Sequence, residues 1–368
     1  MTFSAQVKDR PTREAPGRPL QADDDHEQVV VKQDPDTGLR FLIAVHSTVL
    51  GPALGGLRLR RYPGGLHEAL ADVLSLARTM TLKASAAGLD LGGGKAVMLD
   101  DGRRDARERR LEQAGEIIES LDGAYITAED IGTTTEDMEV IARRTRFVVG
   151  RAERYGGRGD PSPVTAETVF QAIRRGLAVA TGSDELEGRR VGVVGLGKVG
   201  LPLAGKLAAA DARVIGCDID STRVERFVAE HGGEVAPSAQ AILGMELDVL
   251  APCAAGGLVD AAIAHSIECN VIAGAANNPL TDREVARVLD GRGILYVPDF
   301  LANCGGLIRV SSEWYGDRGR DEADCIARAM ERVEAALDEA ELSGSTPLEV
   351  AEHHALARIE AVRGRLAA

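Results

Sequence analysis

The sequence predicts an α/β protein of two domains, the second of which is a Rossmann-type domain. Three observations carry this prediction. The chain has 368 residues, a length typical of two domains or three. Short apolar stretches alternate with longer stretches of helical period, as in sheets built by crossover connections. A G-x-G-x-x-G pattern follows one of these apolar stretches in the second half of the chain.

The first domain is expected over residues 26–150, after an arm at 1–25 whose scattered charges and prolines predict disorder and no secretory signal. Its first elements are a β-hairpin, because apolar residues flank the turn sequence at 34–38. A helix follows over 66–85 and is ended by Gly88 and the glycines at 92–94. The remaining strands and helices alternate and are expected at 95–99, 105–121, 124–127 and 135–144.

The second domain is expected over 164–315. The residues before it are rich in glycine and proline, which predicts a hinge. A helix over 165–181 precedes the first strand, and further strands are predicted at 214–218, 248–251, 271–275 and 294–297. The remaining residues, 316–368, have helical period, and we expect these helices to pack back on the first domain.

The composition argues against several classes of function. The formal net charge is −14, which repels nucleic-acid phosphates and anionic membranes, and 3% of the residues are aromatic. No apolar stretch approaches the roughly 20 residues of a membrane span. The five cysteines form no C-x-x-C pair, and the seven histidines show no zinc-binding spacing. We therefore expect a cytoplasmic protein with reduced thiols, no metal site and no nucleic-acid or membrane partner.

The glycine-rich pattern predicts a dinucleotide site. Gly195 permits a tight turn, Gly197 lets the backbone approach a pyrophosphate, and Gly200 allows the following helix to pack closely on the strand. The same loop also contains Lys198 and Val199. Asp218 ends the next strand, where a carboxylate binds the ribose hydroxyls of NAD and repels the extra phosphate of NADP. The alternative is a glycine-rich turn without a ligand.

Lysine is rare in this chain, with six lysines among 43 basic residues. Two of them, Lys83 and Lys95, lie close in sequence in a glycine-rich part of the first domain. An ammonium can lose its proton on burial, whereas a guanidinium stays protonated. One lysine could therefore bind a substrate carboxylate while the other, desolvated beside it, acts as a general base. The alternative is that Lys83 is a solvated charge at a helix end and Lys95 a charge at a strand edge.

Two polar segments follow predicted strands, where ligands of such folds bind. In the segment 129–133, a carboxylate such as Asp130 could bind a substrate ammonium, or the Asp could instead cap the next helix. The second segment, 277–279, is Asn-Asn-Pro and could form a turn or face a ligand.

These residues lie in segments that resemble a known family, the amino-acid dehydrogenases that act on glutamate, leucine, phenylalanine and valine. The resemblance extends from about residue 27 to the C-terminus. It rests on LGPALGG (50–56), MTLK (80–83), LDLGGGK (89–95), TAEDIGT (127–133), PSPVT (161–165), APCA (251–254), AGAANN (273–278), and PD (298–299) with NCGG (303–306).

The resemblance implies an N-terminal substrate and catalytic domain, a Rossmann domain that binds NAD, and a cleft between them. It implies that Lys83 binds the substrate carboxylate, Lys95 is the general base and Asp130 holds the amino group. Thr165 and Asn277 then fix the nicotinamide and the substrate. The implied reaction is the reversible oxidative deamination of an amino acid to a 2-oxo acid and ammonia, in a homo-oligomer such as a dimer or an octamer.

The resemblance also implies which residues form the substrate pocket: Leu54, Gly55, Met80, Ala128, Leu307 and Val310. All are apolar, which favours a hydrophobic substrate because a buried polar group without a partner costs several kcal/mol. In the family the residues at Ala128 and Leu307 separate aliphatic from aromatic substrates. Here Ala128 is the residue that goes with aliphatic substrates, whereas Leu307 is the one that goes with phenylalanine. We expect a branched-chain aliphatic amino acid. The chain departs from the family pattern at Leu82, Ala84, Val149, Cys304, Ser312 and Trp314.

Three alternatives stay open. The altered neighbours of Lys83 would also suit a non-catalytic NAD-binding regulator. The changed support of the site would suit a dehydrogenase specialised for an unusual amino acid. A dehydrogenase of another small acid, such as a 2-hydroxy acid, is the third, although paired lysines with Asp130 suit an ammonium-bearing substrate better.

Overall fold

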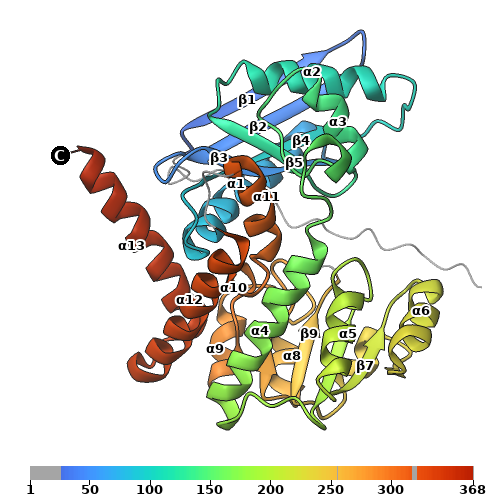
Figure 1. Ribbon diagram of the computed structural model, residues 1–368, viewed down its shortest axis with the longest axis vertical. Coiled ribbons are helices and arrows are strands. Elements are labelled where there is room, and N and C mark those ends of the chain that lie inside the picture. Colours follow the sequence, from blue (N-terminus) through green and yellow to red (C-terminus); the bar gives the residue numbers. More distant parts are fainter. Residues whose placement is uncertain (1–25, 255, 317–320, 368) are drawn as a thin grey trace, which may run out of the picture.

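The computed structural model describes residues 26–254, 256–316 and 321–367, and the arm expected over 1–25 lies outside these residues. Two sheets form the two ends of the described part, and helices lie between and beside them (Figure 1). The α/β class and the Rossmann-type sheet are therefore confirmed. None of the helices in the described ranges is both long and apolar enough to cross a membrane.

The N-terminal sheet has the strand order β1-β2-β4-β3-β5 within the described residues. The predicted hairpin is confirmed, because β1 and β2 are antiparallel neighbours. β4 is antiparallel to β2 and parallel to β3, and β3 is parallel to β5. The strands span Gln28–Asp34 (β1), Leu39–Ser47 (β2), Ala53–Arg60 (β3), Gly92–Leu99 (β4) and Tyr125–Glu129 (β5).

Two features of this sheet differ from the prediction. β3 was not predicted as a strand, and β4 starts three residues early, so that the glycines at 92–94 lie inside the strand. Close packing explains both. A Cβ at Gly93 would lie 2.0 Å from the backbone nitrogen of Thr81, and a Cβ at Gly55 would lie 1.8 Å from the oxygen of Gly94. Glycine is needed here because a helix and the neighbouring strands approach the backbone directly.

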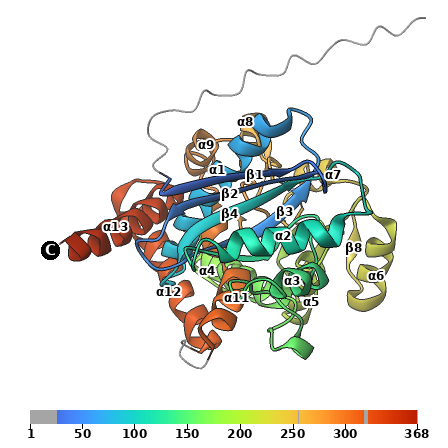
Figure 2. The same ribbon diagram turned by 90° about the horizontal axis from the view of Figure 1, so that it is seen from above.

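Three helices cover this sheet: α1 (Gly65–Ala86), α2 (Arg107–Glu119) and α3 (Thr135–Ala142). α1 packs against β2 and β4, whereas α2 and α3 pack on each other and against β5. Seen from above, α1 and α2 lie on opposite sides of the sheet (Figure 2). Every residue of β4 is buried as a result. The central strand is therefore shielded from water on both faces.

The second sheet is entirely parallel in the described residues and has the order β11-β10-β9-β6-β7-β8. Counted along the chain from β6, this is the order 3-2-1-4-5-6 of dinucleotide-binding folds. Its strands are β6 (Arg190–Val194), β7 (Arg213–Cys217), β8 (Glu234–Val235), β9 (Val249–Pro252), β10 (Val271–Ile272) and β11 (Leu295–Tyr296). The helices α5 (Gly200–Ala209), α6 (Ser221–His231), α7 (Ala239–Leu243), α8 (Ala261–Ser266) and α9 (Glu284–Asp290) connect them.

The last two strands are shorter than predicted, because the chain leaves the sheet after Ile272 and after Tyr296. The residues that follow these two strands turn toward each other. The backbone nitrogen of Asn278 donates to the Asp299 carboxylate at 2.8 Å. The carboxyl ends of β10 and β11 are thereby tied together by polar contacts.

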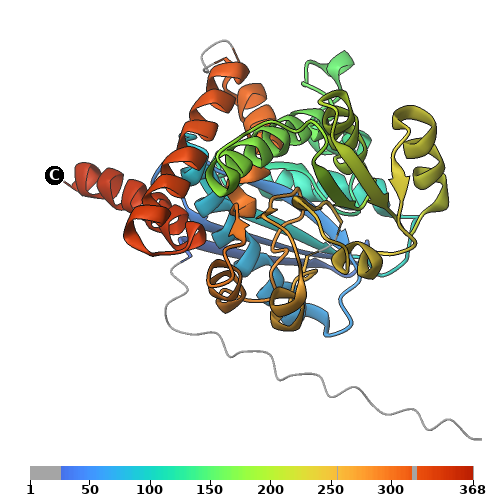
Figure 3. The ribbon, with the colours of Figure 1, turned by 90° about the horizontal axis from the view of Figure 1, so that it is seen from below.

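The remaining helices lie between and beside the sheets. α4 (Ser162–Thr181) follows a short 3-10 helix (Glu153–Tyr155), and α10 (Asp299–Ala302) and α11 (Gly305–Tyr315) follow β11. The C-terminal helices are α12 (Glu322–Ser343) and α13 (Pro347–Ala367). α13 packs against α1 and α12 against α4, and both helices lie at one side in all views (Figure 1, Figure 2 and Figure 3). The C-terminal segment thus contacts elements of both parts of the chain.

Candidate active site

Lys95 and Asp130 form a close ion pair in the N-terminal sheet. Lys95 is 6% exposed on β4, and its Nζ lies 2.8 Å from Oδ2 of Asp130, the first residue after β5. β4 lies between β2 and β3, so the alternative that Lys95 is a strand-edge charge is wrong. A lysine buried in the middle of a sheet needs a partner, and Asp130 provides it.

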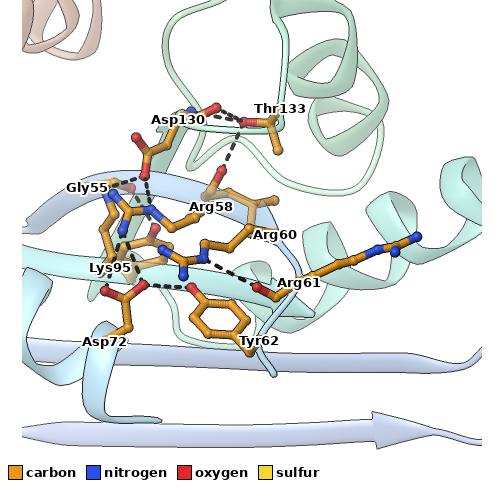
Figure 4. A network of polar contacts seen from close by, with 11 residues as sticks. Gly55, Arg58, Arg60, Arg61, Tyr62, Asp72, Lys95, Asp130 and Thr133 are labelled. Carbon is orange, nitrogen blue, oxygen red and sulfur yellow. Dashed lines mark hydrogen bonds and ion pairs between the residues drawn. The ribbon is translucent and has the colours of Figure 1, made fainter. Parts of the chain in front are cut away.

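A second cation contacts the same carboxylate. Nε of Arg58, on β3, lies 3.1 Å from Oδ2 of Asp130 (Figure 4). Burial raises the pKa of Asp130, but Lys95 and Arg58 together outweigh this and hold the pKa below its usual value. Arg58 was not predicted as a site residue, although an arginine between Leu57 and Leu59 in an apolar stretch is a detectable signal.

The loop after β5 holds Asp130 in place. Thr133 accepts a hydrogen bond from the backbone nitrogen of Asp130 at 2.9 Å and donates to the oxygen of Leu57 at 2.9 Å. The cap of α3 is Thr134, which forms a capping box with Asp137. The alternative that Asp130 caps this helix is therefore wrong, and its carboxylate remains available for the site.

Lys83 lies in the last turn of α1 and belongs to the same cluster. Burial lowers its pKa, and nearby Lys95 adds to this, while Cys304, Asp299 and Asp130 act in the opposite direction. Lys83 is half-buried among charged groups of other elements, which does not fit the alternative of a solvated helix-end charge. Burial likewise raises the pKa of the Cys304 thiol to about 12, so the thiol beside Lys83 is protonated. The structure therefore brings both predicted lysines and Asp130 together.

Strand register explains why these side chains share one side of the sheet. Side chains alternate along a strand, and neighbours in register point the same way. Leu54 and Arg58 on β3, Lys95 on β4 and Ala128 on β5 therefore face the same side. The position of Gly93 next to Thr81 identifies this side as the one that α1 covers.

The predicted pocket residues are apolar and largely buried. Leu54, Ala128, Leu307 and Val310 are buried, and Met80 is half-buried. A Cβ at Gly150 would lie 3.9 Å from both Cβ of Ala128 and Cγ1 of Val310, so these two side chains lie near each other. Leu307 precedes Val310 by three residues on α11, which places both on one helix face. A Cβ at Gly55 would lie 3.4 Å from Cγ of Met80.

The glycine-rich loop of the second sheet has the geometry of a phosphate-binding turn. Gly195 has φ +101°, and a Cβ at Gly200 would lie 1.9 Å from the oxygen of Gly195. Gly197 is open, because only the Arg223 guanidinium lies within reach of a Cβ there, at 3.7 Å. α5 begins at Gly200 and directs its N-terminus to this opening. The loop backbone therefore fits a pyrophosphate.

Asp218 follows β7 and accepts hydrogen bonds from the backbone nitrogens of Leu196 at 2.8 Å and Asp220 at 2.9 Å. Burial raises its pKa, but these donors and Arg223 lower it more. Arg223 lies 3.4 Å from Oδ2 of Asp218 and was not predicted. Asp218 is thus an ionised acid, held by the loop and paired with a cation.

The structure also places Lys198, Val199, Thr165 and Asn277. Lys198 is exposed and lies 3.8 Å from Glu129, which ends β5 of the other sheet, and Val199 packs partly into the core. Thr165 is buried on α4, beside Gly306.

Asn277 accepts a hydrogen bond from Nδ2 of Asn303 at 3.0 Å. Oδ1 of Asn303 is buried without a hydrogen-bond partner among the described residues. Such an atom accepts an N–H group from a ligand at little cost, so this region fits the carboxamide of a nicotinamide. In the described ranges, no three His, Cys, Asp or Glu side chains group together as a metal site requires.

Comparisons with known proteins agree with this architecture. Residues 26–147 match the model of the family described as Glu/Leu/Phe/Val dehydrogenase, dimerisation domain, and residues 156–341 match that of the Glutamate/Leucine/Phenylalanine/Valine dehydrogenase family. Together the two matches cover most of the chain.

Individual relatives point the same way. Leucine dehydrogenase of Thermoactinomyces intermedius is 41% identical over 314 residues, which are 85% of this chain and 83% of that protein. Valine dehydrogenase of Streptomyces virginiae is 43% identical over 314 residues, 85% of this chain and 87% of that protein. The crystal structure of L-tryptophan dehydrogenase from Nostoc punctiforme superposes with a TM-score of 0.78 at 32% identity and covers 92% of this chain and 97% of that chain.

Proposed function

The chain belongs to the Glu/Leu/Phe/Val dehydrogenase family, and from this premise we propose that it catalyses the reversible NAD-dependent oxidative deamination of a hydrophobic L-amino acid. One observation carries the proposal. Lys83, Lys95 and Asp130 come from three elements, α1, β4 and the end of β5, and meet in one cluster in which Lys95 is buried and the other two are half-buried. Two ammonium groups and a carboxylate provide the charges that a substrate carboxylate and a substrate ammonium require.

The roles follow from the charges. Lys83 binds the substrate carboxylate, and Asp130 accepts hydrogen bonds from the substrate ammonium. Lys95 acts as the neutral amine, after its ammonium has released a proton to solvent, and receives a proton from water as the water adds to the imine carbon. The imine forms when the substrate Cα loses a hydride, which bound NAD accepts. One amino acid, one water and one oxidised cofactor thereby give one 2-oxo acid, one ammonium ion, one reduced cofactor and one proton.

The pocket wall supports a hydrophobic side chain on the substrate. Leu54, Met80, Ala128, Leu307 and Val310 offer no charged partner. A buried charged group without a partner costs several kcal/mol, so we propose that glutamate is a poor substrate. Among hydrophobic amino acids we propose a branched-chain aliphatic preference, and it should be broad because one methylene is worth about 1–3 kcal/mol.

The choice of NAD over NADP rests on Asp218. Its ionised carboxylate stands where the ribose hydroxyls bind in this fold, and it would repel a ribose phosphate. Arg223 opposes this by its contact with Asp218. We therefore propose that NAD is preferred, with Asp218 as the residue that decides.

We also propose a homo-oligomer. The match of residues 26–147 to a family described by its dimerisation domain supports this. β1 is the outer strand of its sheet, and Val29 and Val31 on it are 43% and 44% exposed. An edge strand with exposed apolar side chains is a surface that proteins usually cover. The mass in solution tests this, and a monomer at all concentrations would contradict it.

A substrate panel tests the proposed activity. Purified protein is mixed with NAD at alkaline pH and with leucine, valine, isoleucine, phenylalanine, tryptophan, glutamate or a 2-hydroxy acid, and NADH absorbance is followed. We expect turnover with the hydrophobic amino acids, fastest with the branched-chain ones. NADH binding without turnover on any compound would favour a regulator, and ammonia-independent reduction of a 2-oxo acid would favour a 2-hydroxy-acid dehydrogenase.

A further inference from the structure

A row of alternating charges runs from the active site across the N-terminal sheet to α1. Lys95 contacts Asp130, Asp130 contacts Arg58, and Arg58 contacts Asp72 on α1 with 3.1 Å between Nη1 and Oδ2. The row ends at Tyr62, whose hydroxyl donates to Oδ2 of Asp72 at 2.6 Å (Figure 4). Each charge thus has a neighbour of opposite sign.

The contacts at Asp130 are asymmetric. Nζ of Lys95 and Nε of Arg58 both contact Oδ2, at 2.8 Å and 3.1 Å. Neither cation contacts Oδ1, and among the described residues the only further contribution to the carboxylate from its own loop is the backbone of Ile131. A carboxylate held at one oxygen by two cations keeps a defined rotation, and a substrate ammonium then meets an oxygen whose position is set in advance.

Arg58 is a costly residue to place here. Its side chain is 12% exposed, and burial opposes its charge, but Asp130 and Asp72 together raise its pKa and keep it protonated. Burial of charges is often no more stable than apolar packing of the same shape. Fold stability alone therefore does not account for a buried arginine between two carboxylates at this position.

We infer that Arg58 is a positioning residue for Asp130, which it orients and keeps ionised, and that Asp72 and Tyr62 hold Arg58 in place. This inference rests on the proposed role of Asp130 in binding the substrate ammonium. It adds three residues to the site that do not touch the substrate.

The charges of Arg58 and Asp72 set the pH at which Asp130 ionises. Asp130 contacts both Lys95 and Arg58, and these two cations hold the pKa of its carboxyl below the usual value. Removal of the Arg58 charge raises the pKa of Asp130, because a nearby cation favours the ionised carboxylate. Removal of the Asp72 charge lowers the pKa of Asp130, because a nearby anion disfavours it. The neighbouring charged or titratable groups remain in both variants. Lys83 from α1 and Tyr125 and Glu129 from β5 act on Asp130, and Asp299 from α10 and Cys304 from the start of α11 act on Lys83.

The test is the pH profile of kcat/KM for leucine in the full-length protein. For Arg58→Met we expect the acid limb to move to higher pH by about one unit, and for Asp72→Asn to move to lower pH by about half a unit. Arg58→Met should also raise KM for leucine at least about tenfold and leave KM for NAD unchanged. Arg58→Lys, which keeps the charge, should restore the position of the acid limb but not the full rate.

Arg110 is the matched control. It is an arginine of the same domain that is more deeply buried than Arg58, 4% exposed at its side chain, and it pairs with Asp101 away from the site. Arg110→Met should lower stability and leave the acid limb in place. If Arg58→Met does not fold, the same two quantities are measured in Asp72→Asn and Tyr62→Phe: the pH of the acid limb and KM for leucine.

The outcomes are distinct. Suppose that the wild type is active. The inference is then overturned if the acid limb of the pH profile stays in place in Arg58→Met and Asp72→Asn, or if it moves equally in Arg58→Met, Asp72→Asn and Arg110→Met. The proposed function remains intact in both cases. A wild type that deaminates no amino acid would overturn the proposed function and the inference with it.

Discussion

Glu129 and Lys198 face each other from the two sheets, with 3.8 Å between Oε1 of the carboxylate and Nζ of the ammonium. Glu129 ends β5 directly before Asp130, and Lys198 lies in the glycine-rich loop before α5. Burial raises the pKa of Glu129, and Lys198 acts against this rise. The pair therefore links the proposed substrate site to the proposed cofactor site.

The first prediction concerns this pair. Lys198→Ala removes a positive charge from the loop that we expect to bind the pyrophosphate, so KM for NAD should rise about three- to fivefold, within the range of an exposed ion pair. Glu129→Gln frees Lys198 and should lower KM for NAD. Lys206→Ala is the control, since Lys206 is also on this domain and pairs with Glu167 instead. Equal KM values for NAD in all of these variants would contradict the assignment of Lys198.

The second prediction concerns Lys83. Lys83→Met removes the proposed partner of the substrate carboxylate, and a charge-assisted hydrogen bond contributes about 1.5–3 kcal/mol. KM for leucine should therefore rise at least about tenfold, while KM for NAD remains unchanged. Steady-state kinetics with each substrate varied in turn separates the two constants. A rise in the NAD constant alone would place Lys83 at the cofactor instead.

The third prediction concerns cofactor choice. Asp218→Asn removes the charge that we expect to repel a ribose phosphate and leaves Arg223 without its ion pair. The ratio of kcat/KM for NADP to that for NAD should rise about tenfold, which corresponds to about 1.4 kcal/mol. Asp184→Asn, a change at an exposed acid paired with Arg174, should leave the ratio as it is. An unchanged ratio in Asp218→Asn would show that Asp218 does not decide the cofactor.

The fourth prediction concerns stability. Gly93→Ala places a methyl group 2.0 Å from the backbone nitrogen of Thr81, and neither β4 nor α1 can move away without disturbing the site. The free energy of unfolding should fall by about 2–3 kcal/mol. Gly364→Ala is the control, because a Cβ there has no neighbour within 4 Å and lies on α13, where alanine favours the helix by up to about 1 kcal/mol. Denaturant melts of both variants measure the difference, and similar midpoints would contradict the packing of α1 on β4.

Much of this fold could be predicted from local sequence. The glycine-rich loop at 195–200 and the strands around it are local patterns, and the structure has them in the expected order. β3 could not be predicted in this way, because Gly55 and Gly56 interrupt its apolar pattern. Glycine is required at these two positions because residues of β4 and of the end of β5 approach the backbone there. A Cβ at Gly56 would lie 2.7 Å from Cβ of Asp130, a residue far away in the sequence.

The site residues likewise fall into those that the sequence predicted and those that only tertiary contacts reveal. Lys83, Lys95 and Asp130 were identified through sequence segments that resemble a family, and the structure places them together. Arg58 was missed, since its role depends on contacts with Asp130 and Asp72 that only tertiary packing brings about. The Glu129–Lys198 pair and the contact of Arg223 with Asp218 likewise join elements that no local pattern relates.

The most direct test of the central claim compares Lys95→Ala with the wild type and with Lys206→Ala. NADH formation from leucine is followed at alkaline pH, and NADH binding is measured by fluorescence on the same preparations. We expect Lys95→Ala to lose turnover and keep NADH binding, while Lys206→Ala keeps both. Full turnover in Lys95→Ala would contradict the assignment of Lys95 as the group that accepts the proton from water.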